Sequence, residues 1–563
     1  MKTPWTDSVN LNNPLAEYPR PQMSRPDYMI LNGPWEYAIS KSYRFPKKYD
    51  GTIIVPFSPE SELSGVRKTV KKDEFLWYRR TVALPDSFKD KRVLIHFGAV
   101  DREATVWVND IQVASHIGGY LPFDADVTDA LSSSDRIRIV VRVVDDSDSS
   151  EGTRGKQKTR RGGIWYTPQS GIWQTVWMEA VPDTYIKALR ITPDIDSGFV
   201  SVDASVYGEG TAVAHFNGND YPLPALIPAA DCMLWTPEYP KLHAFTVTFG
   251  DDKVNSYFAM RKFSVEDDSD GIPRLFLNNE PYFQNGILDQ GYWPDGLYTP
   301  PCDEAMVYDI RMAKSMGFNM IRKHIKIEPL RWYYHCDRIG MIVWQDMPCG
   351  GGWYNPLIVS APLITGINLK DNAYFLFSRM NASERAAFKT ELAGMIKHLY
   401  NCPSIGMWVP FNEGWGQYDA KKAYALIDSI DRTRVIDHAS GWHDQGIGEV
   451  RSLHVYFKPY KFKSDKRGRA VLLSEFGGFS HKVSGHTFND RYFGYKKFEI
   501  PAQLEIAVED LYADEIRPAV NKGLSAAVYT QLSDVEDELN GLMTYDRKIN
   551  KIPPEKMREY IKI

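Results

Sequence analysis

The chain of 563 residues is too long for one hydrophobic core, and its length predicts about three or four domains. Its apolar content of 43% and charged content of 25% are typical of a globular protein. A net charge of −5 argues against a nucleic-acid partner, and the absence of any run of about 18 apolar residues argues against a membrane partner. The first 22 residues lack an apolar leader, which predicts a cytoplasmic location unless a secretion leader has been removed. The five cysteines form no CxxC pair, so neither a disulfide framework nor a zinc site is expected.

Residues 1–182 alternate between apolar and polar side chains with a period of two. In the segment 103–117, Ala104, Val106 and Val108 share one face, and Asn109-Asp110 is typical of a hairpin turn. Short strands at this spacing predict an antiparallel jelly-roll sandwich. The basic stretch RGKQKTRRGG, residues 154–163, is expected to be a solvated loop.

Residues 183–264 continue with strand-turn-strand patterns and no helical periodicity. A segment of roughly 80 residues with this pattern predicts an immunoglobulin-like sandwich. Strand-like runs then alternate with amphipathic helices over residues 265–563. The helix at 303–317 and the strands at 319–324 and 341–348 are examples, and the segment contains eight strand candidates. This alternation predicts a TIM barrel.

The segment 349–380 is unusually long for a loop between a strand and a helix. Its Gly-Gly-Gly-Trp start and its apolar residues suggest a lid or a wall of a binding subsite. Packing against an interface is the alternative.

Polar side chains stand at the predicted ends of the barrel strands, where TIM barrels carry their catalytic groups. In strand order they are Asn285, Arg322, His324, Gln345, Asp346, Asn412, Glu413, Asp437, His438, His454, Tyr456, Glu475, Tyr529 and Gln531. Glu413 and Glu475 could meet at the barrel mouth about 5 Å apart, which is the carboxylate spacing of a retaining glycoside hydrolase. Ordinary salt bridges at the rim are the alternative for both.

Five segments in order resemble glycoside hydrolase family 2, the family of β-galactosidases, β-glucuronidases and β-mannosidases. Residues 97–131 and the strand SGIWQTVWMEAV resemble its sugar-binding jelly roll, and LWTPEYPKLHAFTV with FAMRKF resembles the end of its immunoglobulin-like domain. FNEGWG resembles the acid/base motif, and LLSEFGG resembles the nucleophile strand. The resemblance covers nearly the whole chain.

The resemblance implies a role for each matching residue. Glu413 would be the general acid/base and Glu475 the nucleophile. Asn412 would bind the sugar 2-hydroxyl. Arg322 would hold Glu475 ionised, and Tyr456 would donate a hydrogen bond to it.

Other residues near the strand ends have two interpretations each. His454 is a sugar ligand or a structural histidine. Asp346 binds a substrate hydroxyl or pairs with Arg322. Trp415 and Trp442 offer an indole face to a sugar ring or simply pack in the core.

The sugar is predicted from a departure from the family pattern. Glucuronidases of the family carry an Asn-x-Lys-Gly motif that binds the substrate carboxylate. Here, matched on Gly541, Asn540 stands in place of the lysine and Glu538 in place of the asparagine, with Asp537 adjacent. An acidic substrate would be repelled there.

A retaining, exo-acting β-galactosidase is therefore the first expectation, with a carbohydrate as its partner. A β-mannoside, a β-galactofuranoside, an arabinopyranoside and, less favoured, a β-glucuronide remain alternatives, as does an inactive carbohydrate-binding protein. No cofactor and no metal ligands are expected. Assembly into a homo-oligomer is left open.

Overall fold

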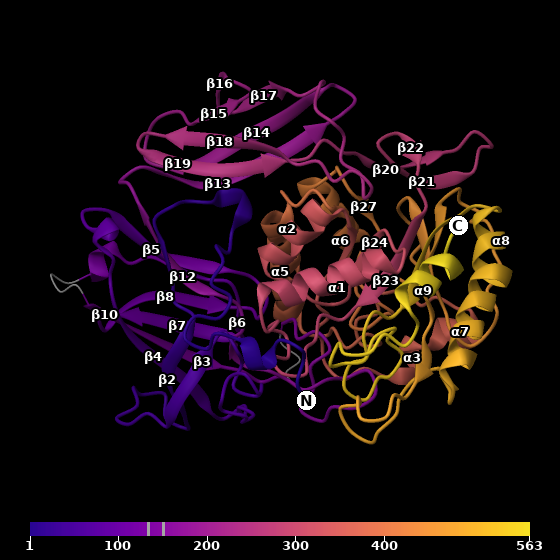
Figure 1. The fold of residues 1–563 in the computed structure, drawn as a ribbon, viewed down its shortest axis with the longest axis horizontal. Helices are drawn as coiled ribbons and strands as arrows, with labels where there is room; N and C mark the ends of the chain where they lie inside the picture. Colours follow the sequence, from indigo (N-terminus) through magenta and orange to yellow (C-terminus); the bar gives the residue numbers. More distant parts are fainter. Residues whose placement is uncertain (132–135, 149–151) are drawn as a thin grey trace.

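The computed structural model describes residues 1–131, 136–148 and 152–563. Its first part is a β-sandwich of two antiparallel sheets, drawn in indigo and violet in Figure 1. One sheet has the order β1 (Tyr28–Ile30), β12 (Val176–Val181), β5 (Arg92–Phe97) and β9 (Phe123–Asp126). The other has the order β3 (Gly51–Val55), β2 (Gly33–Ser40), β4 (Phe75–Ala83), β10 (Arg136–Val144), β7 (Glu103–Val108) and β8 (Ile111–Ile117).

The hairpin β7–β8 is built as its sequence predicts. Ala104, Val106 and Val108 are at most 1% exposed and pack into the core between the two sheets. Asn109 and Asp110 both have positive φ, at 48° and 68°, which is the backbone of a type I′ turn.

A second sandwich follows, in magenta at the top of Figure 1. Its sheets have the orders β13-β14-β17 and β16-β15-β18-β19. The strands are β13 (Tyr185–Asp194), β14 (Phe199–Tyr207), β15 (Val213–Phe216), β16 (Asn219–Pro222), β17 (Ala225–Pro228), β18 (His243–Phe249) and β19 (Asp252–Phe258). The predicted sandwich pair is thus confirmed. The limits 1–182, 183–264 and 265–563 remain predictions.

The third part is an eight-stranded parallel barrel, as predicted. Its strands are β23 (Gln284–Asp289), β24 (Met320–Lys323), β25 (Ile342–Asp346), β26 (Ile405–Val409), β27 (Val435–Ile436), β28 (Val450–Val455), β29 (Ala470–Gly477) and β32 (Leu524–Thr530). Their hydrogen-bonded order runs from β27 through β26, β25, β24, β23, β32 and β29 to β28, so the barrel is nearly closed. A small three-stranded sheet, β20 (Phe263–Asp267), β21 (Pro273–Leu277) and β22 (Glu280–Pro281), joins the second sandwich to the barrel.

Helices cover most of the barrel's outer surface. They are α1 (Asp303–Ser315), α2 (Leu330–Ile339), α5 (Ala382–Leu399), α6 (Ala420–Ile430), α7 (Pro501–Asp510), α8 (Arg517–Val520) and α9 (Pro554–Tyr560), while α3 (Pro356–Val359) and α4 (Ala361–Thr365) are short turns inside the long loop 349–380. In the described part of the chain, none of these helices combines the length and the apolar character that crossing a bilayer requires.

The basic loop of the first sandwich corrects a prediction. Arg154 to Gln157 are buried rather than solvated, because this stretch enters the barrel mouth. The backbone N–H groups of Arg154 and Gly155 both donate to the carbonyl of Cys349, at 2.9 and 3.0 Å. The barrel thus supplies the hydrogen-bond acceptor that these buried N–H groups need. The basic composition of the stretch gives no sign of this contact.

Gly155 is the residue that lets the loop approach this closely. Its φ is +64°, and a Cβ there would lie 2.6 Å from the Tyr120 hydroxyl and 2.7 Å from that of Tyr298. We expect Gly155→Ala to lower the free energy of unfolding by about 2–4 kcal/mol, from backbone strain plus overpacking. Gly65→Ala is the matched control, since φ is +79° there with nothing within 4 Å, and it should cost about 1 kcal/mol. If urea unfolding gave the same loss of free energy of unfolding for both variants, the loop around Gly155 would be able to shift and accommodate the added Cβ.

Candidate active site

Glu413 lies just beyond the end of β26. Its backbone is in the left-handed region, with φ at 52°, and its N–H donates to the carbonyl of Ser440 at 2.9 Å. A non-glycine residue with this backbone is strained and persists only where the surroundings fix it. The carboxylate of Glu413 lies 2.7 Å from His454 Nδ1, and its side chain is only 11% exposed.

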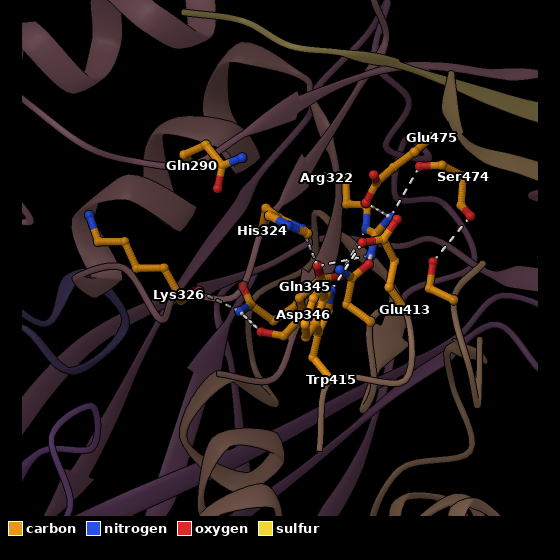
Figure 2. A network of polar contacts seen from close by, with 12 residues as sticks. Gln290, Arg322, His324, Lys326, Gln345, Asp346, Glu413, Trp415, Ser474 and Glu475 are labelled. Carbon is orange, nitrogen blue, oxygen red and sulfur yellow. Dashed lines mark hydrogen bonds and ion pairs between the residues drawn. The ribbon is translucent and has the colours of Figure 1, made fainter. Parts of the chain in front are cut away.

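Glu475 lies within β29, and Arg322 of β24 connects it to the other strand ends (Figure 2). Arg322 Nη1 donates to Glu475 Oε1 at 3.1 Å, and Nη2 donates to Asn412 Oδ1 at 2.8 Å. Arg322 is fully buried, and although burial alone would lower its pKa, the charges of Asp346 and Glu475 raise it. The guanidinium is therefore a fixed positive charge against the Glu475 carboxylate.

The two glutamates meet at one point. One oxygen of Glu413, one oxygen of Glu475 and a ring nitrogen of His454 all lie within 4.8 Å of one another. This separation leaves room for one anomeric carbon between two carboxylates, and it is close to the spacing of retaining glycosidases rather than inverting ones.

Asp346, at the end of β25, pairs with Arg322. Both of its oxygens accept from the guanidinium, each at 3.0 Å, and Oδ2 also lies 2.8 Å from His324 Nδ1. Burial raises the pKa of Asp346, against the lowering effect of Arg322. Of the two predicted interpretations, the pairing with Arg322 is the one that the geometry shows.

Tyr456, just after β28, lies on the outer side of Glu475. Its hydroxyl donates a short hydrogen bond to Glu475 Oε2 and is 3.1 Å from Thr530 Oγ1. Burial, followed by the charge of Glu475, raises the pKa of Tyr456 well above its ordinary value, so the hydroxyl keeps its proton as a donor. Glu475 is thus held by Arg322 at one oxygen and by Tyr456 at the other.

His454 of β28 touches both glutamates. Its Nδ1 is 2.7 Å from Glu413 Oε1 and 3.5 Å from Glu475 Oε2. Its Nε2 faces Arg322 Nη1 at 3.4 Å, and because a guanidinium can only donate, Nε2 is the acceptor and Nδ1 carries the proton. Burial opposes the ionisation of Glu413 and is the largest single influence, but the hydrogen bonds from His454 and Trp415 together with nearby positive charge lower the pKa of Glu413 overall.

Removing this hydrogen bond should shift the pH profile. In His454→Ala the largest lowering influence is gone while burial remains, so the pKa of Glu413 should rise. A general acid works only when protonated, so the alkaline limb of kcat/KM should move to higher pH. His454→Gln, which keeps an amide donor, should move it less.

The pH shift has an internal control. With a dinitrophenyl leaving group, which needs no proton, the alkaline limb should not depend on residue 454. An unchanged limb in His454→Ala on a poor leaving group would contradict the assigned hydrogen bond.

Aromatic side chains form a wall beside Glu413. Trp415 Nε1 donates to Glu413 Oε2 at 3.1 Å, and its ring packs edge-on against Trp165 and Tyr354, with centroids 5.5 and 5.3 Å away. Tyr354 belongs to the loop 349–380, whose predicted role as a subsite wall is consistent with this contact. Trp442 lies farther away, with its ring 6.4 Å from that of His454.

A cavity of about 700 Å³ opens beside β28. Trp442, His454 and Tyr456 line it together with Phe457 and Leu363. Two of these lining residues, His454 and Tyr456, contact the two glutamates.

Two parts of the site were not foreseen correctly. Asn285 lies at the start of β23 rather than at its end, and its side chain donates to the carbonyl of Ile561, so it is away from the barrel mouth. The strand instead ends in Asp289, which binds Lys323. Trp165 was missed because it comes from the first sandwich, where barrel periodicity gives no signal.

Glu413, His454 and Glu475 also form a group that could hold a metal ion, by their spacing alone. Glu475 is already bound by Arg322 and Tyr456. An ion held by the three would also occupy the space between the carboxylates that a sugar carbon has to enter.

Two family models match the chain: "Glycosyl hydrolases family 2, sugar binding domain" over residues 62–182 and "Glycosyl hydrolases family 2, TIM barrel domain" over residues 302–530. Together they cover more than half of the chain, in the order that the fold shows. The chain belongs to glycoside hydrolase family 2.

Its relatives differ in the sugar they are named for. The chain is 24% identical over 443 residues to a β-galactosidase of Thermoanaerobacter pseudethanolicus, covering 72% of this chain and 55% of that one. It is 24% identical over 388 residues to the β-glucuronidase of Rattus norvegicus, and the match covers 59% of this chain and 58% of that one. The chain thus spans little more than half the length of these relatives.

Solved structures show the same fold over almost the whole chain. A β-glucuronidase of an uncultured Clostridium species matches with a TM-score of 0.75 at 18% identity, covering 96% of this chain and 98% of that one. A β-galacturonidase of Eisenbergiella tayi, solved with galacturonate, matches with a TM-score of 0.73 at 17% identity, covering 97% and 99%. At such identities the likeness concerns the fold alone.

Proposed function

We propose that the protein is a retaining, exo-acting β-glycosidase that works by double displacement. The observation that carries this proposal is the separation within 4.8 Å of one Glu413 oxygen and one Glu475 oxygen. The loops 152–167 and 349–380 form walls around these carboxylates. Such walls leave room for the end of a sugar chain rather than for a continuous polysaccharide.

In the first step a Glu475 oxygen attacks the anomeric carbon. The bond from that carbon to the leaving oxygen breaks, and Glu413 gives that oxygen its proton, so the sugar becomes an ester of Glu475. In the second step Glu413, now ionised, takes a proton from water. The hydroxyl attacks the same carbon and frees Glu475, with the configuration retained.

The surrounding residues support these two steps. Arg322 and Tyr456 each donate a hydrogen bond to Glu475, and so orient its carboxylate before it attacks. The hydrogen bond from His454 favours ionised Glu413, which the second step needs. Asn412, fixed by Arg322, has an amide NH₂ to offer to the sugar 2-hydroxyl.

We consider two candidates for the terminal sugar of the substrate. A β-galactoside comes first from the sequence, because Asn540 replaces the lysine of the carboxylate-binding motif and the acidic Glu538 replaces its asparagine. However, Asp537 accepts hydrogen bonds from Arg161 at 3.0 Å and from Asn489 at 2.6 Å, and Glu538 accepts from Tyr166 and Asn540. Carboxylates with such partners repel a substrate less than free ones would, and this observation favours a β-uronide as the second candidate.

The reaction class is tested by following product configuration with proton NMR. With nitrophenyl β-galactoside and β-glucuronide, we expect the β-anomer to form first and to mutarotate later. An initial α-anomer would mean an inverting enzyme, and no turnover on either sugar would favour a carbohydrate-binding protein.

A further inference from the structure

Lys156 belongs to the first sandwich, yet it lies at the mouth of the barrel. Its backbone is fixed there, because the preceding two N–H groups donate to the carbonyl of Cys349, just beyond β25, and its own carbonyl accepts from the N–H of Tyr166 at 3.0 Å. The residue is only 9% exposed. The first sandwich thus places a lysine among barrel residues that carry the proposed chemistry.

The ammonium of Lys156 has no hydrogen bond or ion pair within the described ranges, and its only described contact is with the Tyr166 ring, 5.7 Å from the centroid. Buried lysines nearby differ: Lys323 binds Asp289 and Glu328, and Lys326 binds Glu328 and two carbonyls. Burying an ammonium without a partner costs several kcal/mol. A partner brought by the substrate would offset that cost.

The charge of Lys156 acts on Glu413 and on two residues at neighbouring strand ends. Burial, and next the charge of Lys156, lower the pKa of His324 well below its ordinary value. The charge also acts on Asp346 and Glu413, in opposition to the effect of their burial. These three residues stand at the ends of β24, β25 and β26, so the ammonium lies near three neighbouring strand ends.

Lys156 is also close to the stretch that replaces the family's carboxylate-binding motif. The ring beneath its ammonium belongs to Tyr166, whose hydroxyl donates to Glu538, and Glu538 accepts from Asn540 Nδ2 at 3.0 Å. Asn540 occupies the position where that motif has its lysine. A positive charge missing from the barrel loop is therefore present nearby, on a different domain.

We infer that Lys156 is the residue that selects the sugar, and that the terminal sugar carries an anionic group, a carboxylate or a sulfate ester, bound by its ammonium. This inference rests on the proposed glycosidase function and specifies its substrate class. A charge-assisted hydrogen bond to a buried ammonium is strong and is lost entirely with the neutral sugar.

The test compares matched nitrophenyl β-glycosides: galactoside, galacturonide, glucoside, glucuronide and galactoside 6-sulfate. We expect wild-type kcat/KM to be at least about 100-fold higher for one anionic sugar than for its neutral partner. Which anion is preferred separates carboxylate from sulfate.

The variants assign that preference to Lys156. Lys156→Met should lower kcat/KM for the preferred anion about 100-fold and leave the neutral partner within about threefold. Lys156→Arg should keep most of the preference, because it keeps the charge. Lys68→Met, an exposed lysine of the same sandwich, should change neither. Inhibition by neutral and by uronic isofagomine gives a second measurement, and undiminished binding of the neutral compound shows that Lys156→Met is folded.

Each remaining outcome overturns the inference. A wild-type enzyme that prefers the neutral sugar contradicts it while leaving the proposed glycosidase intact. An equal loss on both sugars in Lys156→Met would mean that the ammonium only balances the charges of Glu413 and Asp346. Failure of the wild type on every glycoside would remove the proposed function together with the inference.

Discussion

Glu475→Ala should lower kcat by at least about 10⁴-fold on any glycoside that the wild type hydrolyses, because the variant lacks the atom that attacks the anomeric carbon. The substitution leaves the anomeric space open on the side that Glu475 occupied. Added azide can enter that space and attack with a good leaving group present. We therefore expect rescue by azide, with the α-glycosyl azide, of inverted configuration, as the product.

This result can be separated from general damage to the protein. Glu505→Ala, which removes a surface carboxylate paired with Lys556, should keep kcat within about twofold. Full activity in Glu475→Ala would rule it out as the nucleophile. A β-glycosyl azide would instead point to Glu475 as a residue that acts on the leaving-group side.

Arg322→Met should impair both catalysis and stability. Glu475, Asp346 and Asn412 all lose a shared partner inside a site where Arg322 itself is fully buried. Breaking a buried ion pair from one side typically costs 3–5 kcal/mol, so we expect a loss of about that size in urea unfolding. Because the positive charge facing the Glu475 carboxylate is gone, kcat/KM should fall about 10³-fold at neutral pH.

Arg432→Met is the matched control for this prediction. Its side chain is 79% exposed and 3.5 Å from Asp428, so the free energy of unfolding should change by less than about 0.5 kcal/mol. An Arg322→Met protein as stable as the wild type would show that Asp346 and Glu475 find other partners or become neutral without cost.

The part of the site that lies at the ends of the barrel strands could be predicted from the sequence. Arg322, Asp346, Asn412, Glu413, Tyr456 and Glu475 each follow or end an apolar run, and parallel strands bring such positions to one rim. The pairing of Arg322 with Glu475 and the hydrogen bond from Tyr456 both agree with the expected geometry.

The contributions from outside the barrel were not predictable in this way. The stretch around Lys156 is basic and contains glycine, which is typical of a solvated loop, and only the three-dimensional fold brings it against Cys349. Asn285 was misplaced because the apolar run of β23 extends to Leu288, so the pattern does not show which polar residue ends the strand.

The trapping of a glycosyl-enzyme with a 2-deoxy-2-fluoro glycoside tests the central claim most directly. The fluorine slows both steps, and a good leaving group lets the first proceed, so the ester accumulates and can be located by mass spectrometry of peptides. Galactosyl and glucuronyl reagents should both be used. We predict the label on Glu475, in the peptide that contains LLSEFGG. A label on Glu413, or on any other residue, would contradict the arrangement of nucleophile and acid/base proposed for this barrel.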